Sequence, residues 1–177
     1  MARSTTTTTA NDGVVKTEQR SHDRLVEPSL SAVDQLDADA VLVGLCSDVR
    51  PLGGLLGMLD WRLCGRVSTM VERGAITGVD GEKVLFPTFG RIKVPRLFLY
   101  GWGPHAHAAS KASERVAAMI EMVKKAGGER VVFAFPEPAR GLVHFADEVE
   151  RGLGKKLVAV FAPDPLPPCD EGVGRSR

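Results

Sequence analysis

Short apolar runs alternate with longer amphipathic segments along the central part of the chain. The clearest run, residues 38–46 (ADAVLVGLC), is almost continuously apolar, as a strand covered on both faces of a sheet should be. Similar runs predict further strands at residues 29–33 (a first edge strand), 83–87, 96–100, 130–135 and 156–161. Helices are predicted between them at residues 55–73, 110–126 and 138–153. This order predicts an α/β fold, a three-layer α/β/α sandwich around a mixed, mostly parallel sheet.

Each predicted helix carries one apolar stripe at helical spacing. The stripes are Leu56, Leu59, Leu63, Val67 and Met70 in the first helix, Val116, Met119, Ile120 and Val123 in the second, and Leu142, Phe145, Ala146, Val149 and Leu153 in the third. We interpret these side chains as core, because apolar residues of this kind are among the most often buried. Gly127 and Gly154 are the expected helix stops, since glycine tolerates a positive φ.

Composition divides the chain into three parts. Residues 1–27 are polar and rich in threonine, which predicts a flexible tail. Residues 28–162 contain nearly all of the periodic pattern and form the predicted domain. Residues 163–177 begin with a proline-rich run that cannot sustain a helix or a central strand, so a second flexible tail is predicted there. Apolar residues at 44% and charged residues at 25% are values typical of a globular protein.

Charge and cysteine content exclude several classes of function. The net charge of +1 gives no broad basic field for nucleic acid. No apolar run reaches the roughly 20 residues that span a bilayer, and the N-terminus lacks the apolar stretch of a signal peptide. Cys46, Cys64 and Cys169 show no CxxC spacing, so reduced thiols in a cytoplasmic protein are expected.

The first predicted helix has an aromatic residue on its polar side. Trp61 lies opposite the apolar stripe, near Gly65, and tryptophan is over-represented among residues that anchor protein interfaces. Arg62 and Arg66 form a second stripe beside it together with Arg73. One interpretation is that Trp61 is covered by a loop of its own domain. The other is that Trp61, Arg62 and Arg66 form an interaction surface for a protein partner or a second copy.

Several segments in order resemble the N-terminal domain of the cytosol (leucyl) aminopeptidases. They are residues 39–45 (DAVLVGL), 50–52 (RPL), 59–62 (LDWR) with Gly65 and Ser68, 81–85 (GEKVL) and 96–103 (RLFLYGWG). In that family the catalytic chemistry belongs to a second domain with a two-metal site, and no segment like its Asn-Thr-Asp-Ala-Glu-Gly-Arg motif occurs here. Two-metal hydrolysis needs several clustered carboxylates, whereas the acidic residues here are dispersed.

The resemblance therefore implies a non-catalytic assembly or protein-interaction module, with no enzyme activity, no metal and no cofactor. An accessory subunit of a separately encoded aminopeptidase is an alternative. The family's N-terminal domain also resembles macro domains, which bind ADP-ribose, so phosphate or nucleotide binding is a further alternative. Its candidate residues are Gly53, Gly54, Gly101 and Gly103, because glycines let backbone N–H groups approach a phosphate. This chain lacks the asparagines and the early aspartate of the macro-domain pattern.

Two smaller patterns involve histidine and cysteine side chains. His105 and His107 have HxH spacing, but zinc sites normally need at least three protein ligands and no further ligands are evident. Cys46 and His105 both follow predicted strands and would form a nucleophilic pair only with a supporting context that the sequence does not provide. A surface loop and an inert buried thiol are the expected outcomes.

Overall fold

A six-stranded sheet forms the centre of the molecule, with the strand order β1-β6-β5-β2-β4-β3. The computed structural model describes residues 24–137 and 141–161. The strands are β1 (Leu25–Val26), β2 (Ala40–Cys46), β3 (Lys83–Pro87), β4 (Arg96–Gly103), β5 (Val131–Ala134) and β6 (Leu157–Phe161). Only β3 runs antiparallel to its neighbour, and the other pairs are parallel. The predicted mixed, mostly parallel sheet is therefore confirmed.

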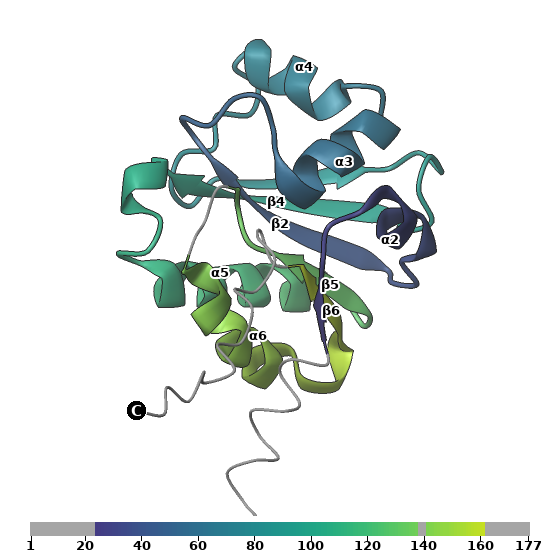
Figure 1. Ribbon diagram of the computed structural model, residues 1–177, viewed down its shortest axis with the longest axis vertical. Coiled ribbons are helices and arrows are strands. Elements are labelled where there is room, and N and C mark those ends of the chain that lie inside the picture. The colour runs from purple at the N-terminus through teal and green to yellow at the C-terminus, as the bar shows by residue number, and fades with distance from the viewer. Residues whose placement is uncertain (1–23, 138–140, 162–177) are drawn as a thin grey trace, which may run out of the picture.

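Helices cover both faces of the sheet, as Figure 1 shows. Helices α2 (Leu30–Gln35), α3 (Gly54–Arg62) and α4 (Arg66–Glu72) lie on one face, and α5 (Ala112–Lys125) and α6 (Ala146–Leu153) lie on the other. Short 3₁₀ helices occur at η1 (His105–His107), η2 (Leu142–Phe145) and η3 (Gly154–Lys156). This arrangement is the predicted three-layer sandwich.

The alternation of side chains along the strands separates the core into two layers. On β2, Ala40 and Leu42 face α5 and α6, whereas Val41 and Val43 face α3 and α4. All seven residues of β2 are buried, which explains why its sequence is apolar throughout. The predicted stripe of α5 is confirmed, because Val116, Met119, Ile120 and Val123 all belong to the same core layer.

The predicted edge strand at residues 29–33 is wrong, because this segment is the helix α2. The Ser29 hydroxyl accepts a hydrogen bond from the Ala32 N–H at 3.1 Å and thereby caps the first turn. The edge strand of the sheet is instead β1, where Leu25 pairs with Val160. It lies within the segment that was expected to be a polar tail.

The predicted helix over residues 55–73 is two helices, α3 and α4, separated by a sharp turn. Cys64 and Gly65 adopt left-handed conformations with φ of 58° and 72°, which a continuous helix cannot accommodate. The Asp60 carboxylate stabilises the break by accepting a hydrogen bond from the Val67 N–H at 2.7 Å at the start of α4. A side chain in the last turn of one helix thus caps the next.

The predicted helix over residues 138–153 also differs from the structure. A 3₁₀ turn, η2, comes first, and the α-helix α6 begins only at Ala146. Residues 138–140, the predicted start of this helix, lie outside the described residues. The predicted glycine stops are confirmed, since Gly127 and Gly154 follow α5 and α6 with φ of 70° and 56°.

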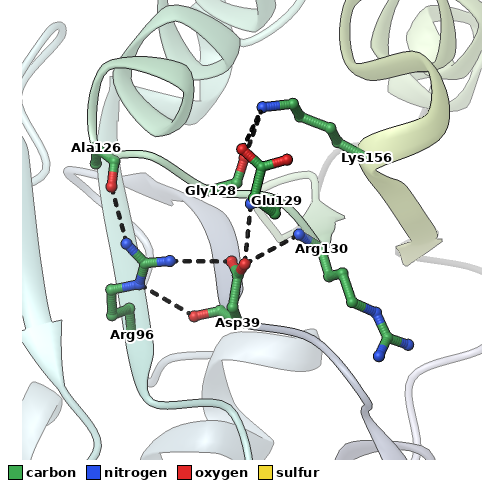
Figure 2. Close-up of polar contacts among 7 residues, drawn as sticks. All are labelled: Asp39, Arg96, Ala126, Gly128, Glu129, Arg130 and Lys156. Carbon is green, nitrogen blue, oxygen red and sulfur yellow. Dashed lines mark hydrogen bonds and ion pairs between the residues drawn. The ribbon is translucent and has the colours of Figure 1, made fainter.

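A polar network at the amino ends of the strands joins three neighbouring strands to α5 (Figure 2). The Asp39 Oδ2 atom accepts hydrogen bonds from the backbone N–H groups of Glu129 and Arg130 at 2.9 and 3.1 Å. Arg96 lies 3.1 Å from Asp39 Oδ1 and donates to the carbonyl of Ala126, the residue that ends α5, at 2.8 Å. This network fixes the relative positions of β2, β4 and β5.

Candidate functional site

Two large aromatic side chains are unusually exposed on the side of the molecule formed by α3, α4 and the turn after β3. Trp61 is 63% exposed and Phe89 is 62% exposed. We call the region that they form with the neighbouring residues the aromatic–arginine surface; it consists of Trp61, Arg62, Cys64, Arg66, Phe89 and Arg91. The interpretation that Trp61 is covered within its own domain is wrong.

An arginine holds the Trp61 ring on the surface. The Arg62 guanidinium carbon lies 4.8 Å from the centre of the indole ring, within the range of a cation–π interaction. Arg62 is fixed in turn by Asp34 of α2, whose Oδ1 atom accepts a hydrogen bond from Arg62 Nε at 2.9 Å. The indole is therefore positioned by a neighbour that itself has a fixed partner.

Phe89 is held in a similar way by the first residue of α4. The Arg66 guanidinium carbon lies 4.8 Å from the Phe89 ring centre, and the ring packs edge-on against Phe86 at a centroid distance of 6.3 Å. Phe89 adopts a φ of 53° in a turn closed by the hydrogen bond from the Arg91 N–H to the Thr88 carbonyl. Such a backbone conformation is unfavourable for a bulky side chain.

Cys64 contacts the turn that follows β3. Arg91 Nη1 lies 3.1 Å from Cys64 Sγ, so the turn that carries Phe89 contacts the turn between α3 and α4. An open depression of about 660 Å³ adjoins this contact, lined by Gly57, Asp60, Trp61, Arg62, Cys64 and Gly65. Of the predicted interaction residues, Trp61 and Arg62 line this depression, and Arg66 lies beside Phe89.

The sequence prediction missed Phe89 and Arg91. Both lie far along the chain from Trp61, and only the folded structure brings their turn against α4. The available signal was an aromatic residue directly before Gly90, in a segment expected to turn after a strand. Aromatic side chains at such positions are candidates for exposure, because a tight turn gives them no core to enter.

The predicted glycine pair Gly53–Gly54 lies at the N-terminus of α3, where the Glu137 side chain covers it. A Cβ atom at Gly54 would lie 2.2 Å from Glu137 Cγ, and one at Gly53 would lie 3.4 Å from Glu137 Cβ. The cavity beside these residues measures only about 10 Å³, close to the space of a single water molecule. An acidic side chain of the protein itself therefore occupies the region where the glycines were expected to approach a phosphate.

The second pair, Gly101 and Gly103, belongs to the end of β4 and not to a free loop. A Cβ atom at Gly101 would lie 1.9 Å from the Val79 carbonyl oxygen, so glycine is required for the close approach of two backbone segments. The Gly103 N–H donates to the Gly78 carbonyl, and the Gly103 carbonyl accepts from the Ser47 N–H. These glycines serve packing between β4 and its neighbours.

An ion pair with one buried and one exposed partner lies beside the carboxyl end of β4. Arg115 of α5 is 5% exposed at its side chain and forms two 3.1 Å hydrogen bonds with the Asp80 carboxylate. The bond from Arg115 lowers the pKa of Asp80 below its ordinary value of 3.8, although partial desolvation opposes the shift. Arg115 also donates hydrogen bonds to the carbonyls of His107 and Ala108. These bonds fix η1 against α5.

The structure does not support the Cys46–His105 nucleophilic pair. Burial raises the pKa of the Cys46 thiol to about 11, and the nearby Asp48 carboxylate adds to the rise. The thiol is thus protonated at neutral pH and poorly nucleophilic. The backbone N–H of His105 is bonded to Asp48 Oδ1 at 2.8 Å, which fixes the loop without recruiting the imidazole.

No metal-binding cluster occurs in the part of the chain that the structure describes. There, no group of three or more histidine, cysteine, aspartate or glutamate side chains is arranged to hold a metal ion. His105 and His107 both belong to η1, a three-residue 3₁₀ turn. Within the same described ranges, no helix has the length and apolar character needed to span a membrane.

The fold and the strand order define the class of the protein as an α/β fold of the macro-domain type. The macrodomain of DarG from Mycobacterium tuberculosis superimposes with a TM-score of 0.56 at 13% sequence identity, over 79% of this chain and 98% of that domain. A leucine aminopeptidase mutant from tomato superimposes with a TM-score of 0.55 at 16% identity, over 81% of this chain and 33% of the enzyme. Identities this low establish the fold alone.

Sequence comparison finds similarity to the cytosol aminopeptidases. The chain is 25% identical over 100 residues to a probable cytosol aminopeptidase from Alkaliphilus oremlandii, a match that covers 56% of this chain and 20% of that protein. No family model matches the chain. The chain spans about one fifth of the length of the curated relatives that it matches. The predicted resemblance to the N-terminal, macro-domain-like region of the cytosol aminopeptidases is confirmed.

Proposed function

We propose that this chain is a non-catalytic protein-interaction module that binds its partner through the aromatic–arginine surface. The observation that carries the proposal is the pair of exposed aromatic rings, Trp61 and Phe89, each held by a stacked arginine. Tryptophan and arginine are the residues most enriched among the anchors of protein interfaces. Because the rings are already fixed, little side-chain entropy is lost when a partner covers them.

The strained backbone supports the same assignment. Cys64 and Phe89 are the non-glycine residues with positive φ among residues 24–137 and 141–161, and both belong to the aromatic–arginine surface. Backbone strain of this kind is concentrated at functional sites. Selection for stability alone would favour glycine or asparagine at these positions.

Catalysis by this chain alone is not part of the proposal. Its curated relatives are aminopeptidases, but the match covers about one fifth of their length. Two-metal peptide hydrolysis needs several carboxylates that hold two cations close together, and the described residues offer no such cluster. The similarity makes a separately encoded aminopeptidase subunit the first partner to test.

The region at the carboxyl ends of the strands, beside Gly53, is a poorer candidate for a binding site than the aromatic–arginine surface. A nucleotide needs a cleft of several hundred cubic ångströms, whereas the cavity beside Gly53 measures about 10 Å³. The Glu137 side chain also packs against Gly54, in the space that a phosphate would need. The aromatic–arginine surface is the larger and more open of these two regions.

The test compares affinity purification of the tagged full chain with that of three variants. Trp61→Ala and Phe89→Asn remove one aromatic ring each, and we expect either to lower the recovery of the bound partner at least about tenfold. Val79→Ser is the matched control, because Val79 is also an exposed apolar residue (55%) but lies in the turn before β3. This control should retain the partner.

Light scattering on the purified chain and on the same variants tests whether the partner is a second copy of this chain. A defined oligomer that Trp61→Ala disrupts would identify a second copy as the partner. A monomer at all concentrations, together with equal recovery of bound protein by all variants, would contradict the interaction surface. Hydrolysis of a leucyl substrate by the purified chain with manganese or zinc would contradict the non-catalytic assignment.

A further inference from the structure

We infer that the partner presents an acidic segment, in which carboxylates alternate with apolar side chains, to the aromatic–arginine surface. This inference rests on the proposed function and specifies the chemistry of the partner. Two independent features carry it: the charge of the surface and the shape of the depression beside Trp61.

The surface has an excess of positive charge. Arg66 and Arg91 are exposed, and neither forms an ion pair with any carboxylate in the described ranges. The Asp60 carboxylate, in the last turn of α3, is 6% exposed and turned inward, where it accepts hydrogen bonds from Val67 and Ser68. Asp34 neutralises Arg62 alone. A partner that supplied carboxylates to Arg66 and Arg91 would complete the charge balance of the surface.

The stacking of the arginines favours carboxylate as the ligand group. A guanidinium that packs one face on an aromatic ring keeps its N–H donors in its own plane, where a carboxylate can accept two parallel hydrogen bonds. The Arg66 guanidinium carbon lies over the Phe89 ring, 4.8 Å from its centre. The ring excludes water from one side of the arginine and strengthens the pair that a carboxylate would form.

The depression beside the indole accounts for the apolar part of the partner. Gly57 and Gly65 line it without side chains, so the Trp61 ring stands beside open space of about 660 Å³. An aliphatic or aromatic side chain of the partner that entered this space would cover the ring and bury apolar area on both molecules. Carboxylates alone would leave Trp61 exposed.

A second copy of this chain fits the surface less well. A symmetric contact through the same face would bring Arg66 and Arg91 of both copies together, and like charges at an interface oppose association. The net charge of the whole chain is only +1, so the long-range field for a nucleic acid is weak. Charge complementarity therefore selects an acidic protein segment.

The experiment selects peptides from a random peptide library displayed on phage, using the full chain as the target. We expect the selected peptides to be rich in aspartate and glutamate and to contain apolar side chains. Their affinity should fall at least about tenfold for Arg66→Glu/Arg91→Glu, and should fall steeply as salt rises. Replacement of the acidic peptide residues by lysine should restore binding to this variant and abolish binding to the original chain.

Lys124→Glu/Lys155→Glu is the matched control, because it reverses two exposed positive charges on the opposite side of the sheet. It should bind the selected peptides like the original chain. Thermal melting establishes that each variant is folded, and Arg66→Gln/Arg91→Gln replaces the charge reversal if that variant unfolds.

The outcomes separate this inference from the proposed function. Peptides that lose binding to Trp61→Ala but bind the arginine variants normally would overturn the acidic partner and leave the interaction surface intact. Peptides that bind all variants equally, or no enrichment at all, would overturn both. Binding of a single-stranded oligonucleotide at Trp61, or an oligomer that the arginine reversal stabilises, would also overturn the acidic protein segment.

Discussion

At the scale of single residues, Phe89 combines an unfavourable backbone with an exposed side chain. Its φ of 53° lies in the left-handed region, which costs an ordinary L-residue about 1–2 kcal/mol. The next residue, Gly90, has a φ of 72°, so the turn needs two consecutive positive φ values. Asparagine and glycine are the usual residues in such turns. A large aromatic residue at this position is explained by function better than by stability.

Phe89→Asn should therefore separate binding from stability. The substitution removes the strain of about 1–2 kcal/mol and also the contacts with Phe86 and Arg66, which are each worth about 1 kcal/mol. We expect the free energy of unfolding to change by less than about 1 kcal/mol while partner affinity falls at least about tenfold. Urea denaturation and a binding assay on the same preparation check both. A loss of several kcal/mol of stability would instead identify Phe89 as a structural residue.

The ion pair between Asp80 and Arg115 predicts a pH dependence of stability. Because Arg115 lowers the pKa of Asp80 in the folded state below the ordinary value of 3.8, the pair stabilises the fold above pH 3.8. This contribution is lost as the pH falls through the folded-state pKa. We expect Asp80→Asn to destabilise the fold by about 1–2 kcal/mol at neutral pH, less than a fully buried pair would, because Asp80 is 42% exposed.

The check is thermal or urea unfolding of the original chain and of Asp80→Asn over a pH series. The difference between the two proteins should be constant near neutral pH and should shrink below pH 3.8. Glu121→Gln is the control, because Glu121 forms a highly exposed ion pair with Lys125 within α5. A difference for Asp80→Asn that does not depend on pH would contradict the assignment to this carboxyl group.

At the scale of elements, the network around Asp39 joins strands that are not consecutive in the chain. We expect Asp39→Ala to lower the free energy of unfolding by about 2–4 kcal/mol, because two backbone N–H groups lose their acceptor and Arg96 loses its ion-pair partner (Figure 2). Lys156→Ala is the matched control at the same edge, and removes an exposed pair with Glu129 that is worth about 0.5 kcal/mol. Equal losses for both variants in urea denaturation would disprove the special role of Asp39.

The elements also show where sequence reasoning succeeded and where it failed. The buried strand β2 was predicted from its continuous apolar sequence, and the apolar stripe of α5 from its spacing. The break between α3 and α4 was missed, because it depends on a hydrogen bond from the Val67 N–H to the Asp60 carboxylate. The segment at residues 29–33 was misassigned because a short apolar run has no clear period, and the cap by Ser29 decided its conformation.

The candidate surface was predictable only in part for the same reason. Trp61, Arg62 and Arg66 are close in sequence, so helical spacing brought them together before the fold was known. Phe89 and Arg91 reach them through a long-range contact between two turns, which no local pattern encodes. Gly53 and Gly54 follow β2 as predicted, whereas Gly101 and Gly103 belong to β4 itself. What covers the two pairs, Glu137 and the turn around Val79, comes from other parts of the chain.

At the scale of the whole molecule, a macro-domain-type fold does not by itself determine a ligand. In open α/β sheets, ligands bind outside the carboxyl ends of the strands, between loops that leave toward opposite faces. Here the loop after β2 leads to α3 on one face and the loop after β4 leads to α5 on the other (Figure 1). The hydrogen bond from the Ser47 N–H to the Gly103 carbonyl continues the β2–β4 pairing up to these loops, and the cavity beside Gly53 measures only about 10 Å³, so this region is almost closed.

This closure predicts that nucleotides do not stabilise the protein. A ligand that binds the folded state raises the melting temperature by mass action, and at 100 times its dissociation constant it adds about 2.7 kcal/mol. We expect ADP-ribose, at concentrations on the order of 1 mM, to leave the melting temperature of the full chain unchanged within the scatter given by inorganic phosphate as the control. A selected acidic peptide should raise it in the same assay. A saturable rise with ADP-ribose would mean that Glu137 and the loop after β2 move aside for a phosphate, and nucleotide binding would then replace partner binding as the function that this fold performs.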